Sequence, residues 1–263
     1  MKRKKKTTLW KIGGQDLPAP SFLFGTIHIK DQRGFKTLSK AYEKIDRCDA
    51  FATEFDLSDH ALHFDTNLVL LPDNQSLQDL YSEKKYHKLK KAFAKYGNLD
   101  LDRFQHFLPI FIVNMLTEQV LKRDQAVSLD ERLWEYAKEK GKITLGIETY
   151  QEQFDILNKI DLKIQLKMLS DIGKNFGKFH KQLHSMADDY EKGEIQKLYK
   201  SGKKSIGKLK KILLFDRNIV MADRIIENAK RQSIFVAVGV GHLAGKKGLL
   251  KLLKDKGYVL KGI

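Results

Sequence analysis

Short apolar runs along the chain predict buried β-strands. Four runs are rich in aromatic and β-branched residues. They lie at residues 21–27, 50–55, 142–148 and 233–240. Three segments with apolar residues three and four positions apart, the spacing of amphipathic helices, precede the last three runs. These segments are 36–48, 129–141 and 215–230. The alternation predicts an α/β fold in which helices flank a central mixed, largely parallel sheet.

Four ionisable side chains stand where the predicted strands end. They are His28, Glu54, Glu148 and His242. Functional groups of parallel sheets collect beyond the carboxyl ends of the strands, so neighbouring strands would bring these four side chains into one pocket. Residues 160–210 have helical periodicity with two possible breaks, at Gly173 and Gly177. We expect this segment to be a helical excursion that covers the site.

Two of the strand ends share the pattern Gly-x-x-His. Gly25 precedes His28 by three positions, as Gly239 precedes His242. Two neutral imidazoles and two carboxylates suit a divalent ion such as zinc, manganese, cobalt or iron. We expect the glycines to let the backbone turn sharply and bring each histidine to the ion without a Cβ clash. Any one of the four side chains alone is better explained structurally, but the repeated pattern favours a metal site.

Other motifs carry weaker signals. His180 and His184 have the spacing of a zinc helix but lack the glutamate of H-E-x-x-H, so we interpret them as a solvated helix face. His60 and His63 lie in a polar connection and are equally weak. The segment "GVGHLAGKKG" fits neither phosphate-loop pattern, and no G-x-S-x-G of a nucleophile elbow occurs.

Composition limits the remaining possibilities. With 263 residues and 42% hydrophobic content, the chain can fill one core, and we predict a single domain at 8–263 after a basic tail at 1–7. Cys48 is the only cysteine, which rules out an intrachain disulfide and a cysteine-based zinc site. No apolar stretch is long enough to span a bilayer. As written, the chain is expected to be cytoplasmic; a signal peptide removed beforehand would instead imply an exported or periplasmic protein.

A formal net charge of +16 raises the question of a nucleic-acid partner. Most lysines are interleaved with acidic residues, apart from the basic runs at 2–6 and 200–211, and no aromatic residues alternate with those runs. We therefore predict no nucleic-acid partner. A steep salt dependence of nucleic-acid binding would contradict this prediction.

Four blocks of sequence resemble a known family. They are "LWKIGGQDLPAPSFLFGTIH", "SLDERLWEYAKEKGKITLGIETYQEQ", "DRNIVMADRI" and "FVAVGVGHLAGKKGLLKLLKDKGYVL". In this order they resemble the successive blocks of the TraB/PrgY/GumN family, which includes the TraB and Tiki metalloproteases. The resemblance runs from about residue 8 to the C-terminus and is loose at 60–125 and 160–210.

The resemblance implies a metal-dependent site built from the two Gly-x-x-His histidines and the strand-end glutamates. At matching positions these are His28, Glu54, Glu148 and His242. Arg217 and Asn218 match a further polar block that faces the same pocket. Some members are peptidases that use manganese or cobalt, whereas others are regarded as regulators of peptide pheromone signalling. Many relatives are exported or membrane-anchored, and this sequence shows no such segment.

We therefore predict a metal-dependent hydrolase, a metallopeptidase acting on a peptide or protein substrate through a His/Glu-bound divalent ion. Glu54 is favoured as base or water-orienting group and Glu148 as ligand, although nothing in their spacing separates the two roles. Arg217 would stabilise an oxyanion or bind a substrate carboxylate, unless it is a surface arginine paired with a neighbouring aspartate. Asn218 is expected to bind substrate. The alternative is a peptide-binding regulatory protein without turnover, and the oligomeric state is left open.

Gln153 and Thr149 follow Glu148 closely and have two possible roles. They cap the next helix or orient the ligands, and capping is the simpler interpretation.

Overall fold

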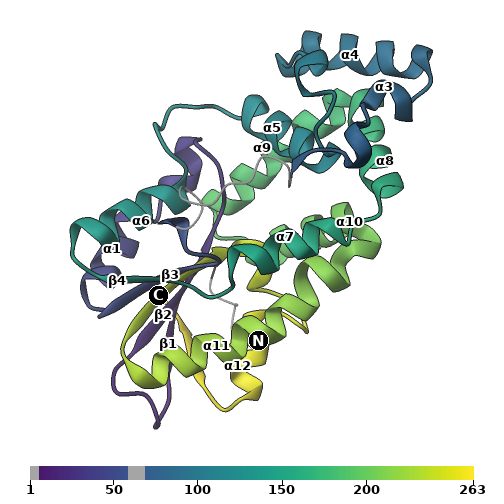
Figure 1. Ribbon diagram of the computed structural model, residues 1–263. Helices are drawn as coiled ribbons and strands as arrows, with labels where there is room; N and C mark the ends of the chain where they lie inside the picture. Colours follow the sequence, from purple (N-terminus) through teal and green to yellow (C-terminus); the bar gives the residue numbers. More distant parts are fainter. Residues whose placement is uncertain (1–5, 59–68) are drawn as a thin grey trace.

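The computed structural model describes residues 6–58 and 69–263 (Figure 1). Its six strands form one sheet in the order β4-β3-β5-β2-β1-β6. The strands are β1 (Leu9–Gly13), β2 (Ser21–Thr26), β3 (Ala50–Thr53), β4 (Ile143–Gly146), β5 (Ile234–Gly239) and β6 (Val259–Gly262). The predicted strands are β2 to β5; they are neighbours and run parallel, while β1 and β6 add two antiparallel pairings. The prediction of a mixed, largely parallel sheet is confirmed.

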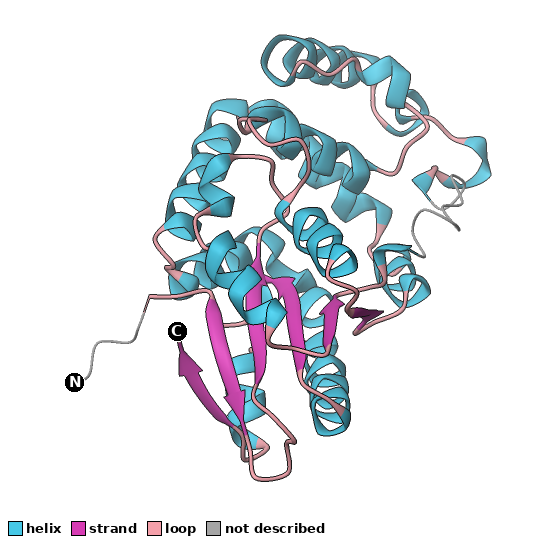
Figure 2. Ribbon diagram, turned by 90° about the vertical axis from the view of Figure 1, so that its left-hand side faces the viewer, coloured by secondary structure: helices cyan, strands magenta, loops and turns pink. Residues whose placement is uncertain are grey.

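Helices cover both faces of the sheet (Figure 2). The helix α1 (Leu38–Asp46) and the helix α6 (Leu129–Glu139) contact strands β3 to β5 and each other, while α11 (Arg217–Arg231) and α12 (Leu249–Asp255) pair on the other side. Helices α1, α6 and α11 match the predicted segments at 36–48, 129–141 and 215–230.

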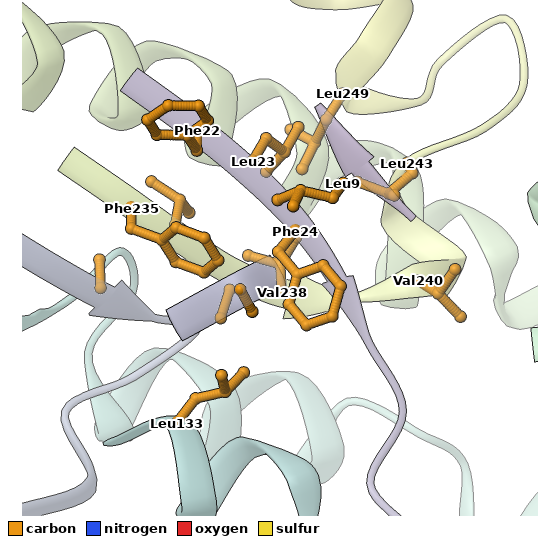
Figure 3. Close-up of a cluster of buried hydrophobic side chains, with 14 of the residues drawn as sticks. Leu9, Phe22, Leu23, Phe24, Leu133, Phe235, Val238, Val240, Leu243 and Leu249 are labelled. Atoms are coloured by element: carbon orange, nitrogen blue, oxygen red, sulfur yellow. The ribbon is translucent and has the colours of Figure 1, made fainter. Parts of the chain in front are cut away.

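Alternation along β2 divides the core between the two faces. The rings of Phe22 and Phe24 both lie against Phe235 of β5, at centroid distances of 6.4 and 6.0 Å. Leu23 points to the opposite face, on the side of Leu249 (Figure 3). All five side chains are at most 5% exposed. A strand buried on both faces in this way reads as a continuous apolar run, which is why "SFLF" predicts its position.

A second layer of helices has its own apolar core away from the sheet, at the top of Figure 1. It contains α3 (Leu77–Leu80), α4 (Glu83–Gly97), α5 (Pro109–Val120) and α8 (Leu162–Lys174). Phe93, Leu116 and Leu169 are fully buried within it. This layer and the sheet core meet through half-buried side chains such as Phe179 and Val120.

The segment 160–210 is helical, as predicted. It comprises α8, α9 (Phe176–Glu191) and α10 (Ile195–Ile206). The break between α8 and α9 falls at Asn175, whose side chain caps α9, and the two glycines expected to mark breaks lie inside helices instead. Gly173 is required there for packing, because a Cβ would stand 2.3 Å from Leu89 Cδ2 of α4.

The excursion reaches the carboxyl edge of the sheet. Helix α9 contacts the short 3₁₀ helix η1 (Gln32–Phe35), which follows β2, and α10 contacts η7 (Val240–His242), which follows β5. The Tyr190 hydroxyl of α9 also donates a hydrogen bond to the carbonyl of Gly25, at 2.7 Å. Both Gly-x-x-His segments therefore lie beneath these two helices.

The remaining connections are short. Helix α7 (Tyr150–Asn158) follows β4, and further single turns are η3 (Pro72–Asn74), η4 (Leu101–Phe104) and η5 (Gly207–Leu209). A π-helix, η6 (Lys211–Asp216), leads directly into α11. Of the predicted basic tail, Lys6 and Thr7 already contact the fold, while residues 1–5 lie outside the described residues, as do His60 and His63.

The two motif glycines have a different role from the sharp turn that we expected. Neither has a positive φ. A Cβ on Gly25 would stand 2.5 Å from Leu243 Cδ1 and 3.1 Å from the Cα of Val240. A Cβ on Gly239 would meet Glu54 Oε1 at 3.0 Å. Close packing, not backbone freedom, therefore favours glycine at both positions, and more strongly at Gly25, where backbone is among the neighbours.

Candidate functional site

The carboxyl ends of β3 and β4 bring two glutamates side by side. Backbone pairing continues past the strands, because the N–H of Glu148 donates to the carbonyl of Glu54 at 2.6 Å. Gly146 permits this close approach, since a Cβ there would lie 2.5 Å from the backbone nitrogen of Asp56. The side chain of Glu148 is 3% exposed and that of Glu54 is 22% exposed. Two carboxylates are thus held next to each other in largely buried surroundings.

Arg217, the first residue of α11, lies between these carboxylates. Its Nη2 donates to Glu54 Oε2 at 2.5 Å and to Glu148 Oε2 at 2.6 Å, and its Nε donates to Glu148 Oε1 at 3.0 Å. Burial alone would lower the pKa of this guanidinium, but the two carboxylates outweigh burial and raise it, so Arg217 stays charged. The group of three side chains carries a net charge of −1 when both glutamates are ionised.

The alternative of a surface arginine paired with a neighbouring aspartate is wrong. The side chain of Arg217 is 13% exposed. Asp216 pairs with Lys211, and Asp223 pairs with Lys256.

Two further donors fix the glutamates. Gln153 of α7 directs its Nε2 to Glu54 Oε2 and Glu148 Oε2, each at 3.2 Å. The N–H of Gly239 donates to Glu54 Oε1 at 2.7 Å. Burial by itself would raise the pKa of Glu54, but the neighbouring His242 and Arg217 and the Gly239 hydrogen bond outweigh it and lower the pKa. Glu54 is therefore ionised at neutral pH.

His242 faces Glu54 from the end of β5. Its Nδ1 lies 2.6 Å from Asn218 Oδ1, and the Asn218 amide donates to the carbonyl of Lys247 at 2.7 Å. The hydrogen bond to Lys247 fixes the side-chain amide of Asn218 so that its oxygen, Oδ1, faces the ring. Because Oδ1 can only accept, Nδ1 carries the proton and Nε2 has a free lone pair. Nε2 lies 3.7 Å from Glu54 Oε1. Burial lowers the pKa of His242 to about 4, so the ring is neutral at pH 7.

His28 lies at the same edge but contacts a different acid. Its Nδ1 is 3.6 Å from Asp130 Oδ2, and its side chain is 62% exposed. The Asp130 carboxylate raises the pKa of His28 above its ordinary value, against the effect of desolvation. Thr26 and Gly239 are partners in the parallel register of β2 and β5, so the two Gly-x-x-His segments leave adjacent strands at the same level.

The donor set fits a divalent cation best at His242 and Glu54. Two lone pairs, one on a neutral imidazole and one on a carboxylate, face each other without a proton between them, an arrangement that a cation would stabilise. Both oxygens of Glu148 instead accept hydrogen bonds from Arg217. Within residues 6–58 and 69–263, no three His, Cys, Asp or Glu side chains are grouped closely enough to form a complete metal site.

The pair His180 and His184 on α9 has its own contacts. The rings are 4.4 Å apart, and Arg33 Nη2 lies 3.2 Å from His184 Nδ1. A guanidinium can only donate, so Nδ1 accepts and the proton sits on Nε2 of a neutral ring. This tautomer leaves His184 without a free lone pair for a metal.

Two site residues gave little or no signal in the sequence. Gln153 was assigned chiefly to helix capping, but Thr149 makes the cap of α7 by accepting from the Glu152 N–H, and Gln153 instead contacts both glutamates. Asp130 was not singled out, because it lies in the first turn of α6 among other acidic residues. The available signal for Asp130 was a carboxylate in the first turn of a helix that leads into a predicted strand.

The fold and this cluster of buried charges belong to a class of α/β proteins in which polar groups gather at the carboxyl edge of a parallel sheet. A profile of the TraB/PrgY/gumN family matches residues 8–261. The chain therefore belongs to the TraB/PrgY/gumN family.

Curated relatives are similar over nearly the whole chain. Metalloprotease TIKI2 of Danio rerio is 24% identical over 95% of this chain and 60% of its own length. Metalloprotease TIKI2 of Xenopus tropicalis is 23% identical over 91% of this chain and 57% of its own length. A metalloprotease TIKI homolog of Amphimedon queenslandica is 22% identical over 95% of this chain and 60% of its own length. The chain thus spans about three fifths of the length of these relatives, and no solved structure matches it.

No helix in the described part of the chain combines the length and apolar character needed to cross a bilayer.

Proposed function

We propose that this protein is a metal-dependent hydrolase, a metallopeptidase that cleaves peptides or proteins with a divalent ion bound at the carboxyl edge of the sheet. One observation carries the proposal: the free Nε2 lone pair of neutral His242 faces the ionised Glu54 Oε1 at 3.7 Å. The names of the metalloprotease relatives support a metal and a protein substrate for this chain as well. Manganese, cobalt and zinc all suit a mixed imidazole and carboxylate set.

His242 and Glu54 are the proposed primary ligands, and His28 is the proposed third ligand from the adjacent strand. When bound, a divalent ion lowers the pKa of its water toward neutrality and polarises the scissile carbonyl. We therefore propose roles that differ from those expected from the sequence: Glu54 is a ligand, and Glu148, whose two oxygens both accept hydrogen bonds from Arg217, is not. In the arrangement described, its contacts favour a role in orienting Arg217.

Arg217 is the proposed group that stabilises negative charge on the substrate. Its Nη1 makes only a long contact, 3.4 Å, to the carbonyl of Leu213, so this nitrogen retains donor capacity for an oxyanion or a substrate carboxylate. Asn218 is 2% exposed and holds His242 through Nδ1. We therefore propose for Asn218 an indirect role that orients His242, in place of direct substrate binding.

Metal content and peptide hydrolysis of four variants test the proposal. His28→Ala and His242→Ala should lose metal and activity together, because each removes a ligand. Glu54→Gln should lose metal, whereas Glu148→Gln should keep most of it and lose turnover. Lys261→Ala, on the edge strand β6, is the matched control and should keep both. Full activity in either histidine variant, or in protein stripped of divalent ions, would exclude the mechanism.

A peptide-binding protein without turnover is the competing function. The observation in its favour is that Arg217 already neutralises much of the charge of both glutamates. Metal-loaded protein that binds members of a peptide library without cleaving any of them would establish this alternative.

A further inference from the structure

We propose that Asp130 is a positioning residue for His28: it accepts the Nδ1 proton of the ring and so leaves the Nε2 lone pair free, as Asn218 does for His242. The inference rests on the proposed function only in that it assigns Nε2 as the metal-binding nitrogen of both Gly-x-x-His histidines. The placement of Asp130 itself depends on contacts that are independent of any metal.

The carboxylate of Asp130 is held in place by a neighbour on β2. Its Oδ1 accepts a hydrogen bond of 2.5 Å from Thr26 Oγ1, and Thr26 is 1% exposed. The bond ties α6 to the strand that ends just before His28. With one oxygen fixed in this way, the orientation of the other oxygen is also determined, because a carboxylate is planar.

The second oxygen of Asp130 is buried, and it has no hydrogen-bond partner within residues 6–58 and 69–263. A buried acceptor left unsatisfied destabilises the fold, so such an atom usually has a partner. His28 Nδ1 lies 3.6 Å from this oxygen, beyond hydrogen-bond length but within ion-pair range. The His28 ring is largely exposed and has room to close the remaining gap.

Helix capping does not explain Asp130. The amino end of α6 is capped by Ser128 and Glu131, each of which bonds to the backbone of the other. Asp130 therefore contributes to the helix only the general preference for acidic residues in a first turn.

The two histidines then share one arrangement. In each case an oxygen acceptor from a neighbouring helix, Asp130 of α6 or Asn218 of α11, faces Nδ1. Acceptors of this kind fix the tautomer and orientation of a metal-binding histidine.

Long-range ¹H–¹⁵N NMR of the His28 ring, at a pH where it is neutral, tests the proposal without reference to activity. The wild type should carry the proton chiefly on Nδ1, whereas Asp130→Ala should shift it toward Nε2, the position that a free histidine side chain prefers. Thr26→Val should shift it partway. Glu135→Gln, at an exposed acid farther along the same helix that pairs with Arg132, should leave the tautomer unchanged.

Titration with Mn²⁺, Co²⁺ or Zn²⁺ alone gives the functional readout. Asp130→Asn should weaken metal affinity on the order of 10- to 100-fold, while the control Glu135→Gln should not. A wild-type His28 protonated mainly on Nε2, or a tautomer unaffected by Asp130→Ala, would overturn the proposal. Absence of metal binding in the wild type with the expected NMR result would instead refute the proposed function and leave the positioning role intact.

Discussion

The ends of β5 and β2 carry the same Gly-x-x-His pattern on adjacent strands, but their surroundings differ. His242 is 5% exposed and faces a group of three charged side chains, and burial lowers its pKa. His28 is largely exposed, and Asp130 raises its pKa. The comparison teaches that a motif fixes where a side chain leaves the sheet, whereas the neighbouring helices determine its charge and its access to solvent.

The largest effect on the free energy of unfolding should come from removing the charge of Arg217, which lies between the two glutamates near His242. Arg217→Met leaves Glu54 and Glu148 side by side without a counter-charge, and breaking a buried ion pair in this way costs about 3–5 kcal/mol. Arg224→Met is the matched control on the same helix, because Arg224 pairs with Glu152 and both are more than a third exposed. It should cost below about 1 kcal/mol. Urea unfolding measures both variants, and equal losses would contradict the description of Arg217 as the buried centre.

The next largest effect on stability should come from replacing the two motif glycines, Gly25 and Gly239, and the two losses should differ. Gly25→Ala forces a Cβ against Leu243 and the backbone of Val240, and overpacking of this kind costs up to about 3 kcal/mol. Gly239→Ala should cost less in stability, because only the Glu54 carboxylate must move. Thermal unfolding compares the two variants. A larger loss for Gly239→Ala would show that the carboxylate is held more rigidly than the Leu243 side chain.

Removing each histidine sharpens the comparison directly. His242→Ala leaves Asn218 Oδ1 unsatisfied in the core and should cost about 1–2 kcal/mol. His28→Ala removes an exposed side chain and should change stability by less than about 0.5 kcal/mol. Both are measured in metal-free protein, so that ligand loss does not contribute. Similar losses at the two positions would mean that His28 is more tightly packed than its exposure indicates.

The smallest effect concerns pH. The Arg224 contact, against some desolvation, lowers the pKa of Glu152 to about 2 from an ordinary value of 4.5. The contribution of this pair is therefore complete above pH 4.5 and is lost as the pH falls toward 2. Because both partners are partly exposed, it should be below about 1 kcal/mol and decrease with salt. Glu152→Gln should remove this part of the difference in urea midpoint between pH 6 and pH 3; an unchanged difference would exclude it.

Strand positions could be predicted from the sequence because β2, β3 and β5 are buried and read as apolar runs. The edge strand β4 is less buried, but it too was recognised as an apolar run, and it follows a helical pattern. Strand ends of parallel neighbours must meet, and the structure does bring Glu54, Glu148 and His242 together. Which of them touch could not be predicted, because Arg217 reaches them from a helix more than 60 residues away in the chain.

The roles of the glycines and of Asp130 also escaped prediction. Gly25 is determined by the position of Leu243, which lies on another segment. Asp130 is one of several acidic residues near the start of α6, and only the fold shows that it faces His28. Both depend on contacts between distant segments, which a local pattern does not encode.

The central position of β5 has a consequence for how the protein folds. This strand lies between β3 and β2, so the β3–β4 pair and the β1–β2 pair share a sheet only once residues 234–239 are in place. Pairings between residues this distant in sequence form slowly, because chain entropy is lost before the contacts are gained. Early intermediates should therefore contain the local β1–β2 hairpin with an exposed edge, and refolding should be slow and prone to aggregation until the distant strands β3, β4 and β5 join it.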